Sequence, residues 1–593
     1  MAKVNIKIEG IPYEVEAGMT ILEAARACGY EIPSLCAFNH GECNRGSCRV
    51  CLVEATGARG LVASCVYPVN EGMEITISSP KATAARRASV ELLLSNHSMK
   101  CQQCEKNEKC ELLHVARLTG AREDMFEGSQ TPVTYDDLSP SIVRDTSKCV
   151  LCGRCVARCQ NAHGNGILGF ENRGFRTIVA PAENRSFVDS PCIMCGQCVS
   201  VCPTGALMEK SEIARVDDAF RAGKYVVVQT APAVRAALGE EFGMKIGTPV
   251  TGKMVAALRR LGFKKVFDTD YGADLTIMEE ASEFIDRFTH RDRYTWPMFT
   301  SCCPGWVRFL KSQYPDMVGE LSTAKSPQQM FGAVTKTYFA KKIGVDPKNI
   351  VCVSVMPCVA KKAEVDIPNI NDAGAGKDVD YSITTREICR MISADQVDVA
   401  ALPETDFDSP LGTGTGAAVI FGVTGGVMEA ALRTCTYVLT GKNPDPDKTF
   451  LGARGMDGWK EAEYDVAGVR VRTAVVSGLG NARRLIRALR RGEVQYDFVE
   501  VMACPGGCVG GGGQPIHYNE ERAGERGEVL YRYDQKNVMR FSHENPEVQT
   551  LYSDFLGKPC GETAHHLLHT DHFGWQMPLS PNLDEDVRVI RKV

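Results

Sequence analysis

A short segment rich in cysteine and glycine constrains this chain more than any other feature. It reads Cys504-Pro-Gly-Gly-Cys508, and after Val509 four consecutive glycines lead to Gln514. Two thiolates with three residues between them can hold neighbouring atoms of one iron–sulfur cluster. Glycines let the backbone approach an inorganic cofactor more closely than side chains allow, and four in a row would destabilise a regular helix or strand. The segment therefore predicts a metal-cluster site rather than a structural cysteine pair.

The cysteines are unevenly spread along the chain. Of the 26 cysteines, 17 lie in the first 202 residues, mostly with two residues between neighbours. They are far too few per residue for a secreted protein built on disulfides, and too clustered for random structural use. In a chain of this length the pattern indicates metal ligation in a reducing compartment.

Bulk composition is that of an ordinary globular protein. The length of 593 residues suggests about four domains, and the net charge of -5 gives no reason to expect nucleic acid or an anionic membrane surface as partner. The N-terminus has no signal-peptide core, and no apolar run approaches the roughly 18 residues that span a membrane. We therefore expect a cytoplasmic protein without membrane insertion. Export together with a partner that carries the signal is the alternative.

Residues 1–79 begin with strand-like alternation and continue into a first group of cysteines. Their spacing, C-x11-C-x2-C-x13-C, suits a 2Fe–2S cluster. The expected ligands are Cys36, Cys48, Cys51 and Cys65. Cys43 is an alternative to Cys36, because Cys43 with the next two cysteines also matches the plant-ferredoxin run. That run needs a fourth cysteine much further along, so we predict Cys43 to be a spare thiol.

Residues 80–120 carry one histidine and three cysteines. The group consists of His97, Cys101, Cys104 and Cys110. Such a set suits tetrahedral zinc as well as an iron–sulfur cluster. The spacing alone leaves both kinds of site open.

Residues 139–210 contain two copies of the bacterial ferredoxin run, C-x2-C-x2-C-x3-C. In such pairs the fourth cysteine of each run binds the cluster of the other run. One 4Fe–4S cluster is therefore expected on Cys149, Cys152, Cys155 and Cys202. The other is expected on Cys159, Cys192, Cys195 and Cys198. Together with the preceding sites, these clusters would form an electron-transfer chain.

Residues 220–515 change to buried strand-like runs that alternate with amphipathic helices. Tyr225 to Gln229 precedes a loop at Pro232 and a helix that we expect to begin near Val234. The apolar run from Val351 to Met356 leads directly to Cys358. This order of strand, ligand-bearing turn and helix is typical of α/β folds that place their chemistry at the carboxyl ends of parallel strands.

Three segments of this region together resemble a known family. They are Thr300-Ser-Cys302-Cys303-Pro-Gly-Trp306, the run from Met356 to Glu364, and the segment that begins at Cys504. They resemble the signatures of FeFe-hydrogenases. The resemblance implies an α/β catalytic domain, with parallel sheets flanked by helices and an H-cluster between two lobes. This cofactor combines a 4Fe–4S cluster with a diiron subsite that carries CO, cyanide and a dithiolate amine, so maturation proteins are also implied.

The family pattern assigns roles to particular residues. The implied ligands of the H-cluster are Cys303, Cys358, Cys504 and Cys508, the last of which would bridge to the diiron subsite. The N-terminal part resembles the large iron–sulfur subunit of complex I. It implies a β-grasp 2Fe–2S domain, a 4Fe–4S domain held by one histidine and three cysteines, and a ferredoxin-like α+β domain with two 4Fe–4S clusters. One 2Fe–2S and three accessory 4Fe–4S clusters are thus expected.

A buried cluster that handles protons needs a relay of titratable groups to the solvent. The resemblance implies the path Cys302, Glu280, Ser322, Glu283 and Arg287, with a water between the first two. Glu280, Glu283 and Arg287 fall on one face of a helix expected from Leu275 to Phe288. The alternative is that Glu283 and Arg287 form an ordinary surface ion pair.

Further residues match positions that line the diiron pocket in the family. Lys361 would offer a donor to a cyanide ligand, and the other matching positions are Met356, Met502, Gln328, Pro232 and Ala233. Ala233 stands where some family members have a serine, which removes one hydroxyl donor and alters the tuning of the site.

The C-terminal part divides into two segments. Residues 516–575 resemble the small-subunit-like part of the family, and residues 576–593 are expected to be a loosely ordered tail. The histidines of this part could bind a metal, although such scattered residues are more often structural or solvated. They are His565, His566, His569 and His572.

The catalytic segments look most like those of NAD(P)-linked, often electron-bifurcating hydrogenases with several subunits. Because we find no nucleotide or flavin motif in this chain, we expect flavin- and NAD(P)-binding and 2Fe–2S partner subunits, with ferredoxin as a further partner. The alternatives are a stand-alone hydrogenase coupled to ferredoxin, an iron–sulfur electron-transfer subunit, and an H2 sensor without turnover.

Overall fold

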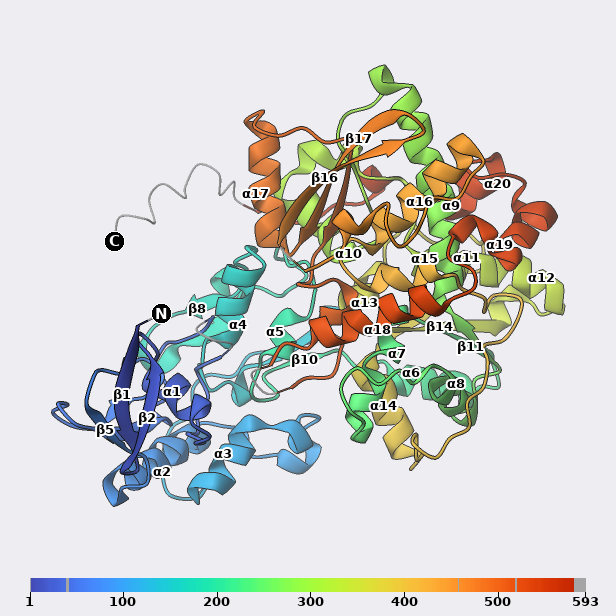
Figure 1. Cartoon of the computed structure of the whole chain (residues 1–593). Helices are drawn as coiled ribbons and strands as arrows, with labels where there is room; N and C mark the ends of the chain where they lie inside the picture. Colours follow the sequence, from blue (N-terminus) through green and yellow to red (C-terminus); the bar gives the residue numbers. More distant parts are fainter. Residues whose placement is uncertain (1, 39–41, 457, 518–519, 581–593) are drawn as a thin grey trace.

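The computed structural model describes residues 2–38, 42–456, 458–517 and 520–580. The N-terminal residues form a separate lobe at the lower left of Figure 1, and the cyan segment around α4 and α5 connects it to the much larger remainder. The expected tail at 576–593 lies mostly outside the described residues. Within the described part of the chain, no helix is both long and apolar enough to cross a membrane.

The first domain is a five-stranded mixed sheet in the order β2-β1-β5-β3-β4. Its elements are β1 (Lys3–Ile8), β2 (Ile11–Glu16), α1 (Ile21–Ala27), β3 (Leu52–Ala55), β4 (Val62–Ala63) and β5 (Met73–Thr76). Strand β1 buries Ile6 and Ile8 and exposes most of the residues between and before them, as the alternation predicts. Helix α1 begins at a capping box between Thr20 and Glu23. Its face packs on the core through Ile21.

Two helices link this sheet to the ferredoxin-like part. They are α2 (Pro80–Ser95), which Ser79 caps, and α3 (Glu111–Thr119), which ends at Gly120 in a left-handed conformation (φ 63°). The following three-stranded sheet has the order β10-β7-β6 and is antiparallel. The strands of this sheet are β6 (Tyr135–Asp136), β7 (Ile142–Asp145) and β10 (Leu207–Glu209). The elements around it are α4 (Arg154–Ala157), β8 (Gly169–Glu171), β9 (Ile178–Ala180) and α5 (Gln197–Ser200).

The two cysteine runs of this part have the same local backbone. Each short helix is preceded by a glycine with positive φ, Gly153 (79°) before α4 and Gly196 (75°) before α5. Leu151 and Met194, at equivalent positions in the two runs, also have positive φ. Because such values are uncommon outside glycine, their repetition supports the duplication inferred from the spacing.

The first sheet of the large domain is fully parallel, in the order β12-β11-β14-β15. Its strands are β11 (Tyr225–Thr230), β12 (Lys265–Asp268), β14 (Ile350–Met356) and β15 (Tyr381–Thr384). Val226 and Val228 point into one hydrophobic core, and Val227 points into another on the opposite face. Both faces are therefore buried, as expected for parallel strands. The surrounding helices are α6 (Ile213–Arg221), α7 (Pro232–Arg235), α8 (Thr251–Arg260), α11 (Pro327–Val334), α12 (Ala340–Ile343), α13 (Ala360–Glu364) and α14 (Thr385–Ala394).

The second sheet is mixed, so the prediction of parallel sheets is wrong here. Its order is β13-β18-β17-β16, formed by β13 (Met298–Phe299), β16 (Trp459–Val466), β17 (Val469–Ser477) and β18 (Phe498–Met502). Strand β16 runs antiparallel to β17. A two-residue turn joins them, and both of its residues, Ala467 and Gly468, have positive φ. Such a turn matches the twist of a hairpin, which reverses the chain without a crossover helix.

Helix α9 (Thr269–Thr289) lies between the two sheets and is longer than the expected range of Leu275 to Phe288. Tyr271 and Leu275 belong to a core shared with the first sheet. Ile277 and Phe284 belong to a core shared with the second sheet. Helix α7 also starts earlier than expected, because Pro232 occupies its first turn, where a missing N–H costs no hydrogen bond.

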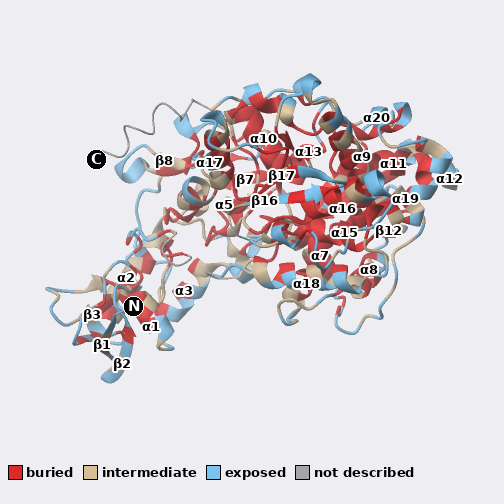
Figure 2. Cartoon of the chain, turned by 45° about the horizontal axis from the view of Figure 1, so that its top comes forward, coloured by how far each residue is buried: buried red, intermediate tan, exposed pale blue. Residues whose placement is uncertain are grey.

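The remaining helices cover the second sheet and the C-terminal side. They are α10 (Pro304–Gln313), α15 (Gly416–Val419), α16 (Gly426–Thr440), α17 (Leu479–Arg490), α18 (Ala523–Lys536), α19 (Pro546–Leu551) and α20 (Glu562–Leu568). Helix α16 is buried from Gly426 to Cys435, and Figure 2 shows it within the red interior. On α18, Asp534 forms buried ion pairs with Arg433 of α16. The C-terminal segment is therefore integrated with the large domain.

Candidate active site and electron-transfer sites

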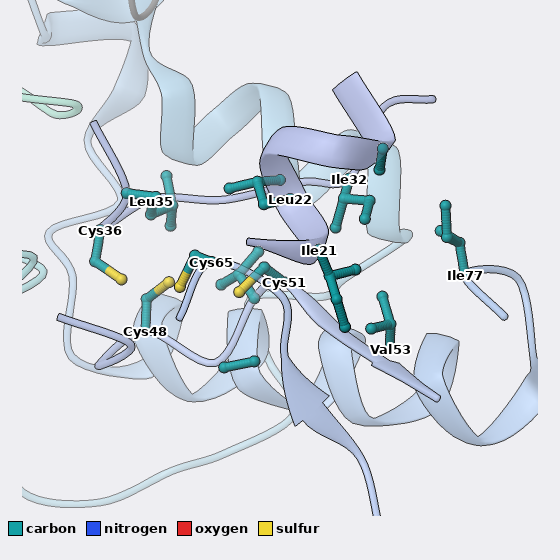
Figure 3. Packing of buried hydrophobic residues seen from close by; sticks show 14 of the residues in the cluster. Ile21, Leu22, Ile32, Leu35, Cys36, Cys48, Cys51, Val53, Cys65 and Ile77 are labelled. Atoms are coloured by element: carbon teal, nitrogen blue, oxygen red, sulfur yellow. The ribbon is translucent and has the colours of Figure 1, made fainter. Parts of the chain in front are cut away.

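Four cysteine side chains converge in the first domain. Figure 3 shows the sulfur atoms of Cys36, Cys48, Cys51 and Cys65 pointing toward one another. All four are buried. The neighbouring Cys65 thiol lowers the pKa of Cys51 to about 7, while contacts with Cys36 and Cys51 raise the pKa of Cys65, so Cys51 becomes a thiolate, the form that binds metals, more readily than Cys65. Cys43 lies elsewhere, with its Sγ 3.7 Å from the carbonyl oxygen of Cys152 in the ferredoxin-like part.

The second group is only partly gathered. His97, Cys101 and Cys110 line one cavity. The sulfur of Cys104 lies against Gly205, where an added Cβ would approach it to 2.9 Å. Burial lowers the pKa of His97 to about 4, so the imidazole is neutral, and its buried Nδ1 has no hydrogen-bond partner among the described residues. A neutral imidazole with a free nitrogen fits a metal ligand.

The two ferredoxin runs exchange their fourth cysteines. One cavity is lined by Cys149, Cys152, Cys155 and, from the second run, Cys202. A second cavity is lined by Cys192, Cys195, Cys198 and, from the first run, Cys159. Burial raises the pKa of Cys149 to about 11 and that of Cys192 to about 12. Buried thiols of this kind fit a metal cluster, which stabilises the thiolate that burial alone disfavours.

Three turns at strand ends bring four more cysteines together. Cys303 caps α10 just after β13, Cys358 follows β14, and Cys504 and Cys508 follow β18. Burial raises the pKa of Cys504 to about 12, and the nearby Cys303 adds to this effect. Burial is also the main cause that raises the pKa of Cys508, and the nearby Cys303 and Cys358 raise it further. The carboxyl ends of strands from both sheets thus meet at one buried group of thiols that fits a cluster.

The glycine run beside these cysteines brings backbone segments of the protein together. An added Cβ at Gly511 would lie 2.2 Å from the carbonyl oxygen of Pro357. At Gly512 it would lie 2.3 Å from the carbonyl oxygen of Cys195. Sequence reasoning attributed these glycines to contact with a cofactor. The contacts seen here give a further reason for glycine, which is the close passage of the chain past its own backbone.

The side chains of the predicted proton path are buried between α9 and residues 301–323. Ser322 Oγ donates to Glu283 Oε2 at 2.7 Å, and Arg287 Nη2 donates to Glu283 Oε1 at 2.6 Å. Glu283 is 9% exposed and Arg287 4%. This pair is therefore not the surface ion pair considered as the alternative.

Among the described residues, Glu280 forms no ion pair. Burial raises its pKa to about 8, and the nearby Glu283 adds to this effect. Ser322 and the backbone of Ser301 lie near the carboxyl group, but among the described residues neither oxygen makes a hydrogen bond of regular geometry. Burial also raises the pKa of Cys302, and the negative charge of Glu280 raises it further. Near neutral pH both groups hold a proton, which suits a relay.

Lys361 is held by a carboxylate that sequence reasoning left without a role. Its Nζ donates to Glu364 at 2.8 Å and to the carbonyl oxygen of Cys302 at 3.2 Å. Glu364 also accepts from Gln328 Nε2 at 2.9 Å and from Ser326 Oγ at 3.0 Å. The signal in the sequence was the spacing of three between Lys361 and Glu364 on one helix. A lysine ammonium has three donors, so one N–H remains for a further acceptor.

Comparisons with known proteins agree with this arrangement. Residues 224–512 match the model of the iron only hydrogenase large subunit, C-terminal domain, and residues 520–575 match the iron hydrogenase small subunit. Earlier segments match a 2Fe-2S iron-sulfur cluster binding domain (1–80), the NADH-ubiquinone oxidoreductase-G iron-sulfur binding region (86–124) and a 4Fe-4S dicluster domain (141–203).

Two relatives and one solved structure extend the match. The NADP-reducing hydrogenase subunit HndD of Solidesulfovibrio fructosivorans is 49% identical over 97% of this chain and 99% of its own length. The chain belongs to the FeFe-hydrogenase family. Iron hydrogenase 1 of Clostridium pasteurianum is 41% identical over 95% of this hydrogenase and 99% of its own length. The apo FeFe-hydrogenase HydA1 of Chlamydomonas reinhardtii is 41% identical, with a TM-score of 0.55 over 62% of this chain and 99% of that one.

The other predicted pocket residues of this hydrogenase lie at strand ends and at the start of α7. Met356 ends β14 and Met502 ends β18, and both are buried. Pro232 begins α7. The carbonyl oxygen of Ala233 accepts from Gln514 Nε2 at 2.9 Å, which ties α7 to the end of the glycine run.

One further buried acid of the hydrogenase was missed. Glu500 lies within β18 and accepts hydrogen bonds from the backbone of Gly425 and Met428, both at 2.7 Å. Burial raises its pKa to about 7. In the sequence it is an acidic residue within a short apolar run, and only its partners at the start of α16 reveal its role as a cap for that helix.

Proposed function

We propose that this chain catalyses the reversible interconversion of H2 with two protons and two electrons, as the hydrogen-converting subunit of an NADP-linked complex. The observation that carries this proposal is the buried group of four cysteines at the strand ends, with Cys302 and Glu280 beside it. A thiolate group for a cluster and a path for protons are the two things such a reaction needs from the protein.

The proposed ligands of the H-cluster are Cys303, Cys358, Cys504 and Cys508. When bound, this cofactor supplies the chemistry that breaks and forms the bond in H2. Lys361 is proposed to direct its remaining N–H toward the cofactor, while Glu364 fixes the position of the ammonium group. Met356, Met502, Gln328, Pro232 and Ala233 are proposed to shape the surrounding pocket and to exclude water.

Protons are proposed to pass along Cys302, Glu280, Ser322, Glu283 and Arg287. The last three are joined by direct hydrogen bonds. The gap is between Glu280 and its neighbours, because its carboxyl oxygens make no regular hydrogen bond among the described residues. A small rotation of the Glu280 side chain, or a water, would close it. The protonated state of Glu280 near neutral pH suits this role.

Electrons are proposed to travel through one 2Fe–2S and three 4Fe–4S clusters bound by the cysteine groups described above, with His97 as the one histidine ligand. Two contacts support the order of these sites. Cys43 joins the first domain to Cys152, and Gln197, next to Cys198, donates to the carbonyl oxygen of Gly510 at 2.7 Å. The second ferredoxin-like cavity thus adjoins the Cys504 group.

The partner subunits are proposed to bind flavin, NAD(P) and a 2Fe–2S cluster, with ferredoxin as a further carrier. The extent of identity with an NADP-reducing hydrogenase subunit supports this arrangement. Maturation proteins would supply the diiron subsite, and placement in the cytoplasm is part of the proposal. In the alternative, a stand-alone enzyme exchanges electrons with ferredoxin alone.

Infrared spectroscopy of the anaerobically matured protein tests the catalytic proposal. We expect CO and cyanide bands that shift when H2 is added and removed. Matured protein without such bands would reduce the chain to an electron-transfer subunit.

The partner proposal is tested by comparing the native complex with the isolated chain. Both are expected to reduce an artificial dye with H2, and only the complex is expected to reduce NADP. NADP reduction by the isolated chain would contradict the need for a nucleotide-binding partner.

A further inference from the structure

Three potential metal ligands lie together next to the proposed proton path. None of them belongs to the cysteine groups described above. They are Glu279 on α9, Cys560 in the turn before α20, and His569 at the end of α20. One ligand atom from each lies within 4.8 Å of the other two. Glu279 and His569 are buried, whereas Cys560 lies at the surface with its thiol partly covered, so an ion could enter past Cys560.

The three residues already contact one another. His569 Nε2 lies 3.0 Å from Glu279 Oε2. The backbone N–H of Cys560 donates to the same carboxylate oxygen at 2.7 Å, and its thiol lies 3.5 Å from the carbonyl oxygen of Glu279. Cys560 has a φ of 53°, a left-handed conformation that is uncommon for a residue other than glycine. This conformation directs its backbone and its thiol toward Glu279.

Neighbouring groups hold the ligands as the surroundings of a metal site do. Thr323 Oγ1 lies 2.8 Å from His569 Nδ1, which leaves Nε2 as the ligating nitrogen. The hydroxyl of Tyr552 donates to the other oxygen of Glu279. Protein metal sites use this kind of support to fix the histidine tautomer and to orient the carboxylate.

We propose that Glu279, Cys560 and His569 form a binding site for Zn2+ or a similar divalent transition-metal ion. One sulfur, one imidazole nitrogen and one carboxylate oxygen suit tetrahedral zinc, with water as the fourth ligand. Binding releases two protons to the solvent, the thiol proton of Cys560 and the proton of the hydrogen bond between His569 Nε2 and Glu279, while the ring keeps its other proton on Nδ1, facing Thr323. No oxidation or reduction is involved.

The site is connected to the proton path. Thr323, which contacts His569, donates through its hydroxyl and its backbone N–H to Glu283, each at 3.1 Å. A cation at His569 would withdraw charge from this network and disfavour a proton on Glu283. Zinc is therefore an inhibitor of proton transfer in this hydrogenase. This effect rests on the proposed proton path, whereas ion binding does not.

X-ray absorption at the zinc edge of the holoenzyme tests binding directly. After exposure to Zn2+ and gel filtration, we expect one sulfur at about 2.3 Å and nitrogen or oxygen neighbours at about 2.0 Å. Cys560→Ser should lose the sulfur signal, while Cys28→Ser, a free thiol in the first domain, should keep it. Zinc that washes out, or a sulfur signal that survives Cys560→Ser, would overturn the site.

Inhibition by zinc tests the connection to the proton path, with each variant compared to its own zinc-free rate. Tyr552→Phe keeps all three ligands and is expected to weaken inhibition about 10–100-fold, the usual effect of losing a supporting partner. Cys28→Ser should be inhibited like the parent enzyme. Zinc bound at full occupancy with an unchanged H2 rate would overturn the connection. Zinc should leave the infrared bands of the cofactor unchanged. If the matured enzyme shows no such bands even without zinc, the proposed catalytic function fails, and not the metal site.

Discussion

A Cβ added at Gly512 would lie 2.3 Å from the carbonyl oxygen of Cys195 and 2.7 Å from the carbonyl carbon of Gly196. This contact joins the last ferredoxin-like cavity to the Cys504 group, which is where electrons are proposed to enter the catalytic domain. Backbone cannot move aside as the end of a flexible side chain can. The contact therefore requires glycine at position 512 for steric reasons, independently of any cofactor.

Gly512→Ala should push the ferredoxin-like part away from the large domain. We expect a loss of about 1–3 kcal/mol in the free energy of unfolding and slower H2 oxidation with an external acceptor. Exchange between H2 and heavy water needs no electron transfer out of the chain, so it should be retained. Gly524→Ala is the control, because its nearest neighbour is the Met456 sulfur at 3.9 Å. Equal loss of exchange and of acceptor reduction would contradict this explanation.

Glu280→Gln should stop proton transfer while leaving the cofactor in place. The amide keeps the size of the side chain but cannot exchange a proton at neutral pH, so turnover should fall about 100- to 10,000-fold. Infrared bands should remain those of the parent enzyme. Glu562→Gln, an exposed residue in the first turn of α20, is the control. Normal turnover in Glu280→Gln would exclude this path.

The same variant predicts how stability depends on pH. Because burial raises the pKa of Glu280 to about 8 in the folded state, its neutral form is favoured there. This stability is fully present below the ordinary pKa and is lost as pH rises toward 8, by up to about 1.4 kcal/mol per pH unit. Glu280→Gln should show a weaker decline between about pH 6 and pH 8 in urea unfolding. A parallel decline in both proteins would show that Glu280 ionises without cost.

Glu364→Ala should leave the Lys361 ammonium buried without its partner. Removing one member of a buried ion pair costs about 3–5 kcal/mol, which urea unfolding would measure. The cyanide bands of the matured enzyme should also shift, because Lys361 loses its fixed position. Glu14→Ala removes an exposed pair with Lys3 and should change neither property. Unshifted bands would argue against a contact between Lys361 and the cofactor.

Spacing along the sequence predicted the sites whose ligands lie close together in the chain. The two ferredoxin runs are examples, since a C-x2-C-x2-C segment has little choice but to surround one cavity, and the repeated backbone at Gly153 and Gly196 agrees with this. The proton-path residues of α9 also followed from spacing, because residues three and four apart share a face of a helix.

Spacing could not show where the spare thiol of Cys43 would lie, nor that the glycine run passes close to the protein's own backbone. Both depend on neighbours that are distant in sequence, namely the ferredoxin-like part for Cys43 and the backbone at Pro357 and Cys195 for the glycines. The antiparallel strand β16 was missed for a related reason. Its direction is set by the turn at Ala467 and Gly468 and by pairing with β17.

The sequence by itself determined which cysteines form local runs, which family the catalytic segments resemble, and where buried strands alternate with helices. These properties depend on the covalent order of residues and on the periodicity of apolar side chains. Tertiary structure alone decided that Lys361 contacts the carbonyl oxygen of Cys302, that Glu283 is buried, and that Cys560 and His569 meet at Glu279. The physical reason is that α9 is packed between two sheets and the C-terminal helices, and this packing brings together residues that the sequence keeps hundreds of positions apart.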